Sequence, residues 1–346
     1  MIQPSLIKPP EHWERLSQQA PALAGDLAFR RFCTPVLSEA RAPDHDALTL
    51  RARRHLRHAK QIQLKTCEGL VQAYILEPLC RNFNGSSISP SGASIHEGER
   101  TKTVILVHGW TSEASFMAAI AEQVRRSGFR VILFDMPAHG LSPGTHTNMI
   151  ACARVFIDVV DQLGPIDYAV AHSMGGLAAL LAAGGGAPYQ RACALDGYVL
   201  IATPNNINVM TDKFAKGLRL TQAARRQYER HLERIAHNPL SKLCVAGYLN
   251  AIQRPVMILH CRDDEEITID NARKIVRQYP AAELREVNGL GHRHILYASN
   301  VTRASTRFLV DLDKQLAAPR RTKSAVPIRP DNSFADSSEE AMRATG

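Results

Sequence analysis

Residues 168–184 combine an apolar run, a turn of small residues and an alanine- and leucine-rich segment, and they constrain the fold more than any other part of the chain. The turn has the sequence Ala-His-Ser-Met-Gly-Gly at residues 171–176. A short apolar run followed by a longer apolar segment predicts a strand, a tight turn and a helix. Strand and helix would collide at such a turn unless the residues two before and two after Ser173 were small. Ala171 and Gly175 meet that requirement.

A serine at the tip of a strand, turn and helix has the arrangement of a nucleophile elbow. Glycine is the usual residue at the first small position, so Ala171 adds one methyl group there. A free serine hydroxyl is too weakly acidic to attack a carbonyl at neutral pH, and it therefore needs a general base. Ser173 is a candidate nucleophile only if the chain also supplies a base, an orienting acid and donors for an oxyanion.

Four further segments place polar residues directly after predicted strands, three of them apolar runs and the fourth the more polar run at 283–287. Each polar group would lie at the carboxyl end of a parallel strand, where α/β proteins place their ligands. In chain order the polar segments are His108-Gly109-Trp110-Thr111, residues 135–142, residues 260–267 and Asn288-Gly289-Leu290-Gly291-His292.

These motifs, in this order, resemble those of the α/β-hydrolase superfamily. The resemblance implies that Ser173 is the nucleophile and that the backbone N–H groups of Trp110 and Met174 hold the oxyanion. It also implies that His292, in a Gly-x-Gly-His turn, is the general base, with His294 as its rival two residues on.

The same resemblance places the orienting acid after the strand at 255–259. The superfamily pattern of His-Gly, two residues, Asp, two residues and an aliphatic residue aligns Asp264 with the acid and Ile267 with the aliphatic position. Cys261 replaces the usual glycine, and Asp263 remains an alternative acid. The order Ser173, Asp264 and His292 is the one expected of this fold.

Other polar residues of these motifs have structural interpretations. Asp135 is expected to organise a loop by accepting hydrogen bonds, and His108 to support the oxyanion loop. Trp110 is a candidate for the lining of an acyl pocket.

The fold class predicted is α/β, specifically an α/β-hydrolase fold with a mostly parallel central sheet, helices on both faces and a short helical cap. The patterns at 114–126, 149–163 and 269–278 predict helices. Residues 61–66 and 70–77 predict an antiparallel hairpin that opens the sheet.

The domain organisation predicted places a helical extension at 1–60, with helices over 10–19 and 47–60. The hydrolase domain follows at 61–316, with a flexible insertion at 81–100 and a helical cap at about 204–250. A tail rich in Pro, Arg and Ser, residues 317–346, is expected to be disordered.

Composition favours a globular enzyme, because 346 residues with 45% hydrophobic content can bury the core of one large α/β domain. No signal-like apolar segment opens the chain, and no run approaches the roughly 20 apolar residues of a membrane span. Seven cysteines without paired spacing predict reduced thiols and a cytoplasmic location. Each cysteine is expected to be a small core or loop residue.

The net charge of +9 is concentrated in residues 51–58 and 213–234. A solvated helix face is the default interpretation of both segments. For the second, attraction of a carboxylate- or phosphate-bearing substrate, or peripheral contact with an anionic membrane, stays open. No nucleic-acid partner is expected, because no nucleic-acid-binding fold is visible. His55 and His58 lack further ligands nearby, so neither a metal nor any other cofactor is expected.

The function predicted is therefore a serine hydrolase that cleaves a carboxylic ester of a small or lipid-like substrate through an acyl-enzyme intermediate. A lysophospholipase, thioesterase, lactonase, amidase or carbon–carbon bond hydrolase would use the same triad. A dehalogenase or an epoxide hydrolase of this fold would carry Asp in place of Ser173. The alternative outside enzymes is a small-molecule receptor or a scaffold that keeps the hydrolase pocket.

Overall fold

A computed structural model describes residues 10–35, 50–79, 100–185, 188–189 and 191–317. Its centre is an eight-stranded sheet in the order β1-β2-β4-β3-β5-β6-β7-β8. The strands are β1 (Lys60–Thr66), β2 (Gly69–Leu76), β3 (Thr103–Val107), β4 (Arg130–Phe134), β5 (Tyr168–His172), β6 (Gly197–Ile201), β7 (Val256–Cys261) and β8 (Glu283–Val287). β2 pairs antiparallel with β1 and β4, and all other pairs are parallel. The mostly parallel sheet is confirmed.

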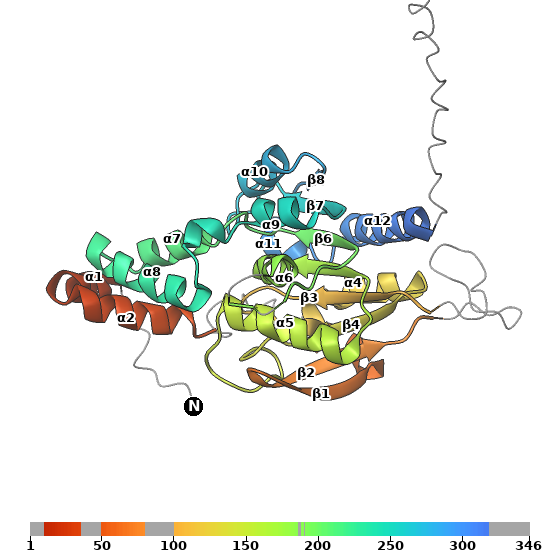
Figure 1. Cartoon of the computed structure of the whole chain (residues 1–346), viewed down its shortest axis with the longest axis horizontal. Coiled ribbons are helices and arrows are strands. Elements are labelled where there is room, and N and C mark those ends of the chain that lie inside the picture. The colour runs from red at the N-terminus through yellow and green to blue at the C-terminus, as the bar shows by residue number, and fades with distance from the viewer. Residues whose placement is uncertain (1–9, 36–49, 80–99, 186–187, 190, 318–346) are drawn as a thin grey trace, which may run out of the picture.

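Helices cover both faces of this sheet (Figure 1). The α-helices are α1 (Pro10–Gln19), α2 (Pro21–Phe32), α4 (Ala118–Arg126), α5 (Met149–Leu163), α6 (Met174–Gly184), α7 (Asn208–Gly217), α8 (Gln222–Ala236), α9 (Val245–Ile252), α10 (Asp270–Gln278), α11 (Gly291–His294) and α12 (Ser299–Ala317). Short 3-10 helices are η2 (Leu56–His58), η3 (Ala114–Met117) and η4 (Leu240–Lys242). Residues 50–55 are also helical.

Alternate residues of each central strand face two separate cores. Ile105 and Val107 of β3 belong to the core that also holds α5, α6, α9 and α10 on one face of the sheet, whereas Val104 and Leu106 belong to the core with α4 and α12 on the other. Both faces of the central strands are buried, so these strands are continuous apolar runs rather than alternating patterns. The loops at the carboxyl ends of the parallel strands converge at one edge of this buried sheet.

A helical layer, formed by α1, α2, α7 and α8, joins two segments that lie far apart in the sequence. α2 packs along α8, as Figure 1 shows at the left of the molecule. Asp26 of α2 accepts hydrogen bonds from Gln227 (2.8 Å) and His231 (2.6 Å) of α8. Thr221, the N-cap residue of α8, donates its hydroxyl to the Ser17 carbonyl of α1. The amino-terminal helices thus pack on the insertion between β6 and β7.

The observed elements differ from the predicted ones in local detail. The helix predicted over 114–126 begins with the 3-10 turn η3, and α2 was not predicted at all. The basic segment 213–234 is not one helix, because Arg219 has a left-handed backbone (φ 51°) and separates α7 from α8. Within the described ranges, no helix combines the length and apolar character needed to cross a bilayer.

Two predicted features fall outside the described residues. The flexible insertion at 81–100 is described only at its last residue, and the disordered tail at 317–346 only at its first. Residues 47–49 of a predicted helix are also outside the described ranges.

Candidate active site

Ser173 lies at the sharp turn between β5 and α6, with a backbone (φ 52°, ψ −127°) that is strained for a residue with a side chain. A Cβ added to Gly175 would lie 2.4 Å from the His108 carbonyl oxygen and 2.8 Å from that of Val107. Only glycine therefore allows α6 to start this close to the end of β3. The side chain of Ser173 is buried rather than on the open surface, since the residue is only 7% exposed and borders a cavity.

The three residues predicted as a triad come together in one hydrogen-bonded chain. His292 Nε2 lies 3.0 Å from Ser173 Oγ, and His292 Nδ1 lies 2.7 Å from Asp264 Oδ2. The carboxylate can only accept, so Nδ1 carries the proton and Nε2 is left to accept from the serine hydroxyl. The His292 backbone carbonyl accepts a hydrogen bond from His172 Nε2 (2.9 Å), the residue just before the serine.

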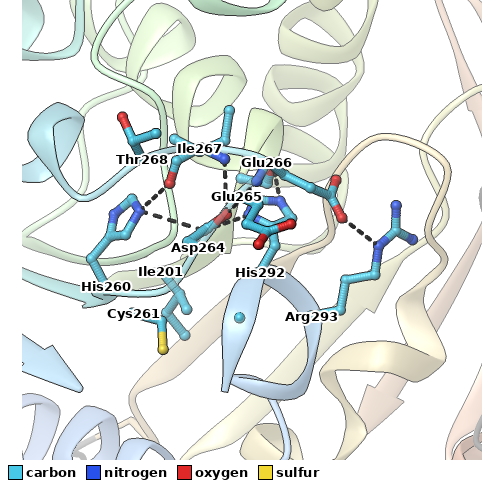
Figure 2. Close-up of polar contacts among 12 residues, drawn as sticks. Ile201, His260, Cys261, Asp264, Glu265, Glu266, Ile267, Thr268, His292 and Arg293 are labelled. Atoms are coloured by element: carbon cyan, nitrogen blue, oxygen red, sulfur yellow. Dashed lines mark hydrogen bonds and ion pairs between the residues drawn. The ribbon is translucent and has the colours of Figure 1, made fainter. Parts of the chain in front are cut away.

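Asp264 is held by more groups than His292 alone (Figure 2). Its Oδ1 accepts from the backbone N–H groups of Glu266 (2.9 Å) and Ile267 (2.8 Å). The buried His260 donates from Nε2 to the Ile267 carbonyl (2.7 Å) and lies 3.5 Å from Asp264 Oδ2. Burial by itself raises the pKa of Asp264, but hydrogen bonds from His260, His292 and the Ile267 N–H outweigh burial and hold the pKa well below its usual range. The carboxylate is therefore ionised at neutral pH.

The alternative acid, Asp263, organises the loop that carries His292. Its carboxylate accepts from the backbone N–H groups of Gly289 (2.7 Å) and Gly291 (3.2 Å). The structure thus joins Asp264, and not Asp263, to His292. The alternative base, His294, is the last residue of the four-residue helix α11 that also holds His292.

Two buried, neutral histidines tie the predicted oxyanion loop to the loop after β4. His108 Nε2 accepts from the Met136 N–H (2.9 Å), and His139 Nε2 accepts from the Thr111 N–H (3.2 Å). In each ring Nδ1 lies 2.7–2.9 Å from a nearby backbone carbonyl, to which it donates. Thr111 has a left-handed backbone (φ 54°), so its position depends on such contacts. Sequence reasoning foresaw a supporting role for His108 but not for His139.

Asp135 has the loop-organising contacts expected of it. Its carboxylate accepts from the backbone N–H groups of Ala114 (2.7 Å) and Leu141 (2.9 Å) and from the Tyr74 hydroxyl (3.1 Å). Burial raises the pKa of Asp135 to about 6, against the lowering effect of these hydrogen bonds.

The buried histidines give the fold an expected acid sensitivity. Burial lowers the pKa of His108 to about 3 and that of His139 to about 4, from an ordinary value of 6.5. Each therefore contributes stability that is complete above pH 6.5 and is lost as the pH falls toward its folded pKa. As the pH falls from 7.5 to 5.0, we expect each of the two histidines to lower the free energy of unfolding by about 2 kcal/mol. Asp135, whose pKa is raised in the folded protein, gains stability over the same pH range and offsets about 1 kcal/mol of this loss.

Replacing His139 by Gln isolates this effect, because an amide oxygen can accept from Thr111 but does not titrate. Urea unfolding at pH 7.5 and 5.0 should show a pH-dependent loss in the His139→Gln variant about 2 kcal/mol smaller than in the wild type. An equal loss in both proteins would contradict the assignment.

A cavity of about 420 Å³ opens over Ser173, with His292, Trp110 and Met174 in its wall. Both residues predicted to donate N–H groups to an oxyanion thus border the space beside the serine. The N–H of Met174 is the first of helix α6 and has no partner within the helix. Gly109 packs against the elbow, since a Cβ built there would lie 3.0 Å from Ser173 Cβ.

Most of the cavity wall is apolar, and part of it comes from the amino-terminal segment. Phe32 of α2 lines the cavity and stacks on Trp110 with ring centroids 6.4 Å apart. It also contacts Phe214 of α7 (5.2 Å) and Tyr228 of α8 (5.5 Å) edge-to-face. Sequence analysis missed Phe32, because nothing in residues 10–35 indicates that this segment reaches a site built around residue 173.

We expect Phe32→Ala to raise KM for medium-chain p-nitrophenyl esters about tenfold, because the wall loses aromatic contact worth about 1–2 kcal/mol. Leu23→Ala is the matched control, since Leu23 lies on the same helix and is 50% exposed. The measurement is steady-state kinetics of both variants. Equal KM values in the two variants would argue against a role of Phe32 in the cavity wall.

Within the described residues, no group of three or more His, Cys, Asp or Glu side chains is arranged to hold a metal ion. The histidines and carboxylates at this edge of the sheet are instead engaged with one another and with backbone groups.

Comparisons with known proteins agree with this architecture. The model of a family described as the alpha/beta hydrolase family matches residues 104–304, more than half of the chain. The esterase Pf2001 of Pyrococcus furiosus has a similar structure, with a TM-score of 0.52 at 18% identity over 76% of this chain and 94% of that one. Est1E of Butyrivibrio proteoclasticus has a TM-score of 0.53 at 17% identity over 73% and 99%. A search of curated proteins found no match. On the strength of the matched family model, the chain belongs to the alpha/beta hydrolase family.

Proposed function

We propose that this protein is a serine hydrolase that cleaves carboxylic esters of small or lipid-like substrates through an acyl-enzyme intermediate. The observation that carries the proposal is the hydrogen-bonded chain from Ser173 through His292 to Asp264 at the wall of an apolar cavity. A serine within 3.0 Å of a histidine that is itself oriented by a buried carboxylate has the arrangement of an activated nucleophile.

In the proposed reaction, His292 Nε2 takes the proton of Ser173 as Oγ attacks the ester carbonyl. Asp264 keeps the imidazole in the required tautomer and stabilises the imidazolium that forms. The N–H groups of Trp110 and Met174 bind the oxyanion, and a donor in such a position contributes about 3 kcal/mol. His292 then protonates the leaving alkoxide. Water, activated by the same histidine, releases the acid, and no cofactor takes part.

Similarity to proteins named as esterases supports an ester rather than another acyl compound as the substrate. Thioesters, lactones, lysophospholipids and C–C bonds next to a carbonyl are the alternatives that the same triad could cleave. We further propose that the helical layer serves as the cap over the hydrolase domain, within an organisation of extension 1–60, domain 61–316 and insertion 204–250. A cytoplasmic location, inferred from cysteine usage, is part of the same proposal.

The experiment that tests the proposal is pre-steady-state hydrolysis of p-nitrophenyl esters of increasing acyl length, together with intact-protein mass spectrometry. The proposal requires a burst of p-nitrophenolate, or a transient mass increase equal to the acyl group, that maps to Ser173. Parallel assays with a thioester, a lactone and a lysophospholipid rank the alternatives. Turnover of none of these compounds by the folded protein would favour the receptor or scaffold alternative.

A further inference from the structure

The charged side chains that line the cavity are mostly cationic. Arg31, Lys213 and Arg293 border it, and the only carboxylate among its described lining residues is that of Glu266. Arg31 is engaged in another contact, which leaves Lys213 and Arg293 as the cations that face a ligand in the cavity. An apolar cavity with cations in its wall favours a ligand that combines a hydrocarbon part with a negative charge.

Arg293 follows the proposed catalytic base directly in sequence, and its side chain is only 21% exposed. Its Nε donates to Glu266 Oε1 at 3.0 Å. In Figure 2 a single dashed line joins the two residues, and the two terminal nitrogens of the guanidinium have none. Among the described residues, no hydrogen bond is formed by these two nitrogens. A largely buried guanidinium with two parallel donors left over matches the geometry of a carboxylate.

Lys213 reaches the same wall from α7. Its Nζ donates to the backbone carbonyls of Glu265 (3.1 Å) and Glu266 (3.5 Å), which follow Asp264. Carbonyl groups orient an ammonium but do not cancel its charge, and a third N–H remains. The helical layer thus places a positive charge beside the acid loop, near Arg293.

We infer, on the basis of the proposed function, that the preferred substrates are esters that carry a free carboxylate. Arg293 would bind that carboxylate through its terminal nitrogens, with Lys213 as the second cation. Glu266 pairs with Arg293, and the ionised Asp264 is bound to His292. Lys213 contacts only backbone carbonyls and forms no ion pair among the described residues, so its charge is the one that a substrate carboxylate would balance. The apolar wall, Phe32 and Phe214 included, would hold the hydrocarbon part between this carboxylate and the scissile ester.

Two substrates that share the scissile ester and differ in the charge of the far end test the inference: mono-p-nitrophenyl glutarate and its methyl ester. At pH 7.5 we expect the wild type to favour the free acid at least tenfold in kcat/KM. Arg293→Met, which keeps an unbranched aliphatic stem and removes the guanidinium and its charge, should lower this ratio at least fivefold. The double variant with Lys213→Met should bring the ratio to about one. Arg262→Met is the matched control, because Arg262 pairs with Glu286 outside the cavity and is expected to leave the ratio unchanged.

Equal rates for the two substrates in the wild type, or an unchanged ratio in Arg293→Met, would overturn the inference while leaving the serine hydrolase proposal in place. Failure to hydrolyse either substrate, with no acyl group on Ser173, would instead overturn the proposed function and this inference with it. The ratio separates these cases because each variant is compared with itself on two substrates.

Discussion

Replacing Ser173 by alanine is expected to lower kcat for ester hydrolysis about 10⁵- to 10⁶-fold. The remaining rate would come from the oxyanion donors and substrate binding, which accelerate hydrolysis without a nucleophile. The fold should persist, because the hydroxyl forms one hydrogen bond, to His292, and its loss costs about 1 kcal/mol. Steady-state kinetics and thermal unfolding of the variant, with Tm lowered by only a few degrees, check both parts.

The control for this prediction is His294→Ala, because His294 was the rival base and lies in the same short helix as His292. It should lose far less activity than His292→Ala. Hydrolysis by Ser173→Ala at a rate near that of the wild type would refute Ser173 as the nucleophile.

Replacing Asp264 by Asn is expected to lower kcat about 10⁴-fold, because it reverses the tautomer of His292. The amide oxygen would keep the bonds from the Glu266 and Ile267 N–H groups, since both donate to one carboxylate oxygen. The amide nitrogen would then face His292 Nδ1 and donate to it. The neutral imidazole would then carry its proton on Nε2. A protonated Nε2 cannot accept the serine proton, so His292 could no longer act as the base.

Asp263→Asn is the matched control, since it makes the same chemical change one residue away. Asp263 supports the backbone of the 289–291 turn, so a loss below tenfold is expected. Comparison of kcat for the two variants decides between the two acids. A 10⁴-fold loss in Asp263→Asn with a small loss in Asp264→Asn would exchange their roles.

The sheet and the position of the site were predictable because they depend on short-range patterns. A central strand buried on both faces must be a continuous apolar run, and the runs at 104–107, 131–134, 168–170 and 198–201 all became strands. In an α/β sheet the ends of parallel strands meet at one edge, and the resemblance to the α/β-hydrolase superfamily implied which residues at that edge, Ser173 and His292 among them, would lie together. The tight turn at Ser173 was predictable from sterics alone, because small residues two positions before and after it let a strand and a helix approach closely.

The rest of the site depends on packing between distant segments, which no local pattern encodes. Phe32 reaches the cavity because α2 packs on α8, and that contact pairs Asp26 with His231 about 200 positions later. The roles of His139 and His260 follow from single hydrogen bonds, to Thr111 and Ile267, that only a folded chain brings into range. The break at Arg219 between α7 and α8 was missed because helical periodicity continues on both sides of it.

The measurement that tests the central claim most directly is covalent labelling of the purified protein with a fluorophosphonate, followed by intact mass and peptide mapping. A hydroxyl activated by His292 attacks this reagent, whereas an ordinary serine does not. The account predicts one adduct per chain, located on Ser173, no adduct in Ser173→Ala and much slower labelling of Asp264→Asn. An unlabelled wild-type protein that is folded, or an adduct on another residue, would contradict the assignment of Ser173 as an activated nucleophile.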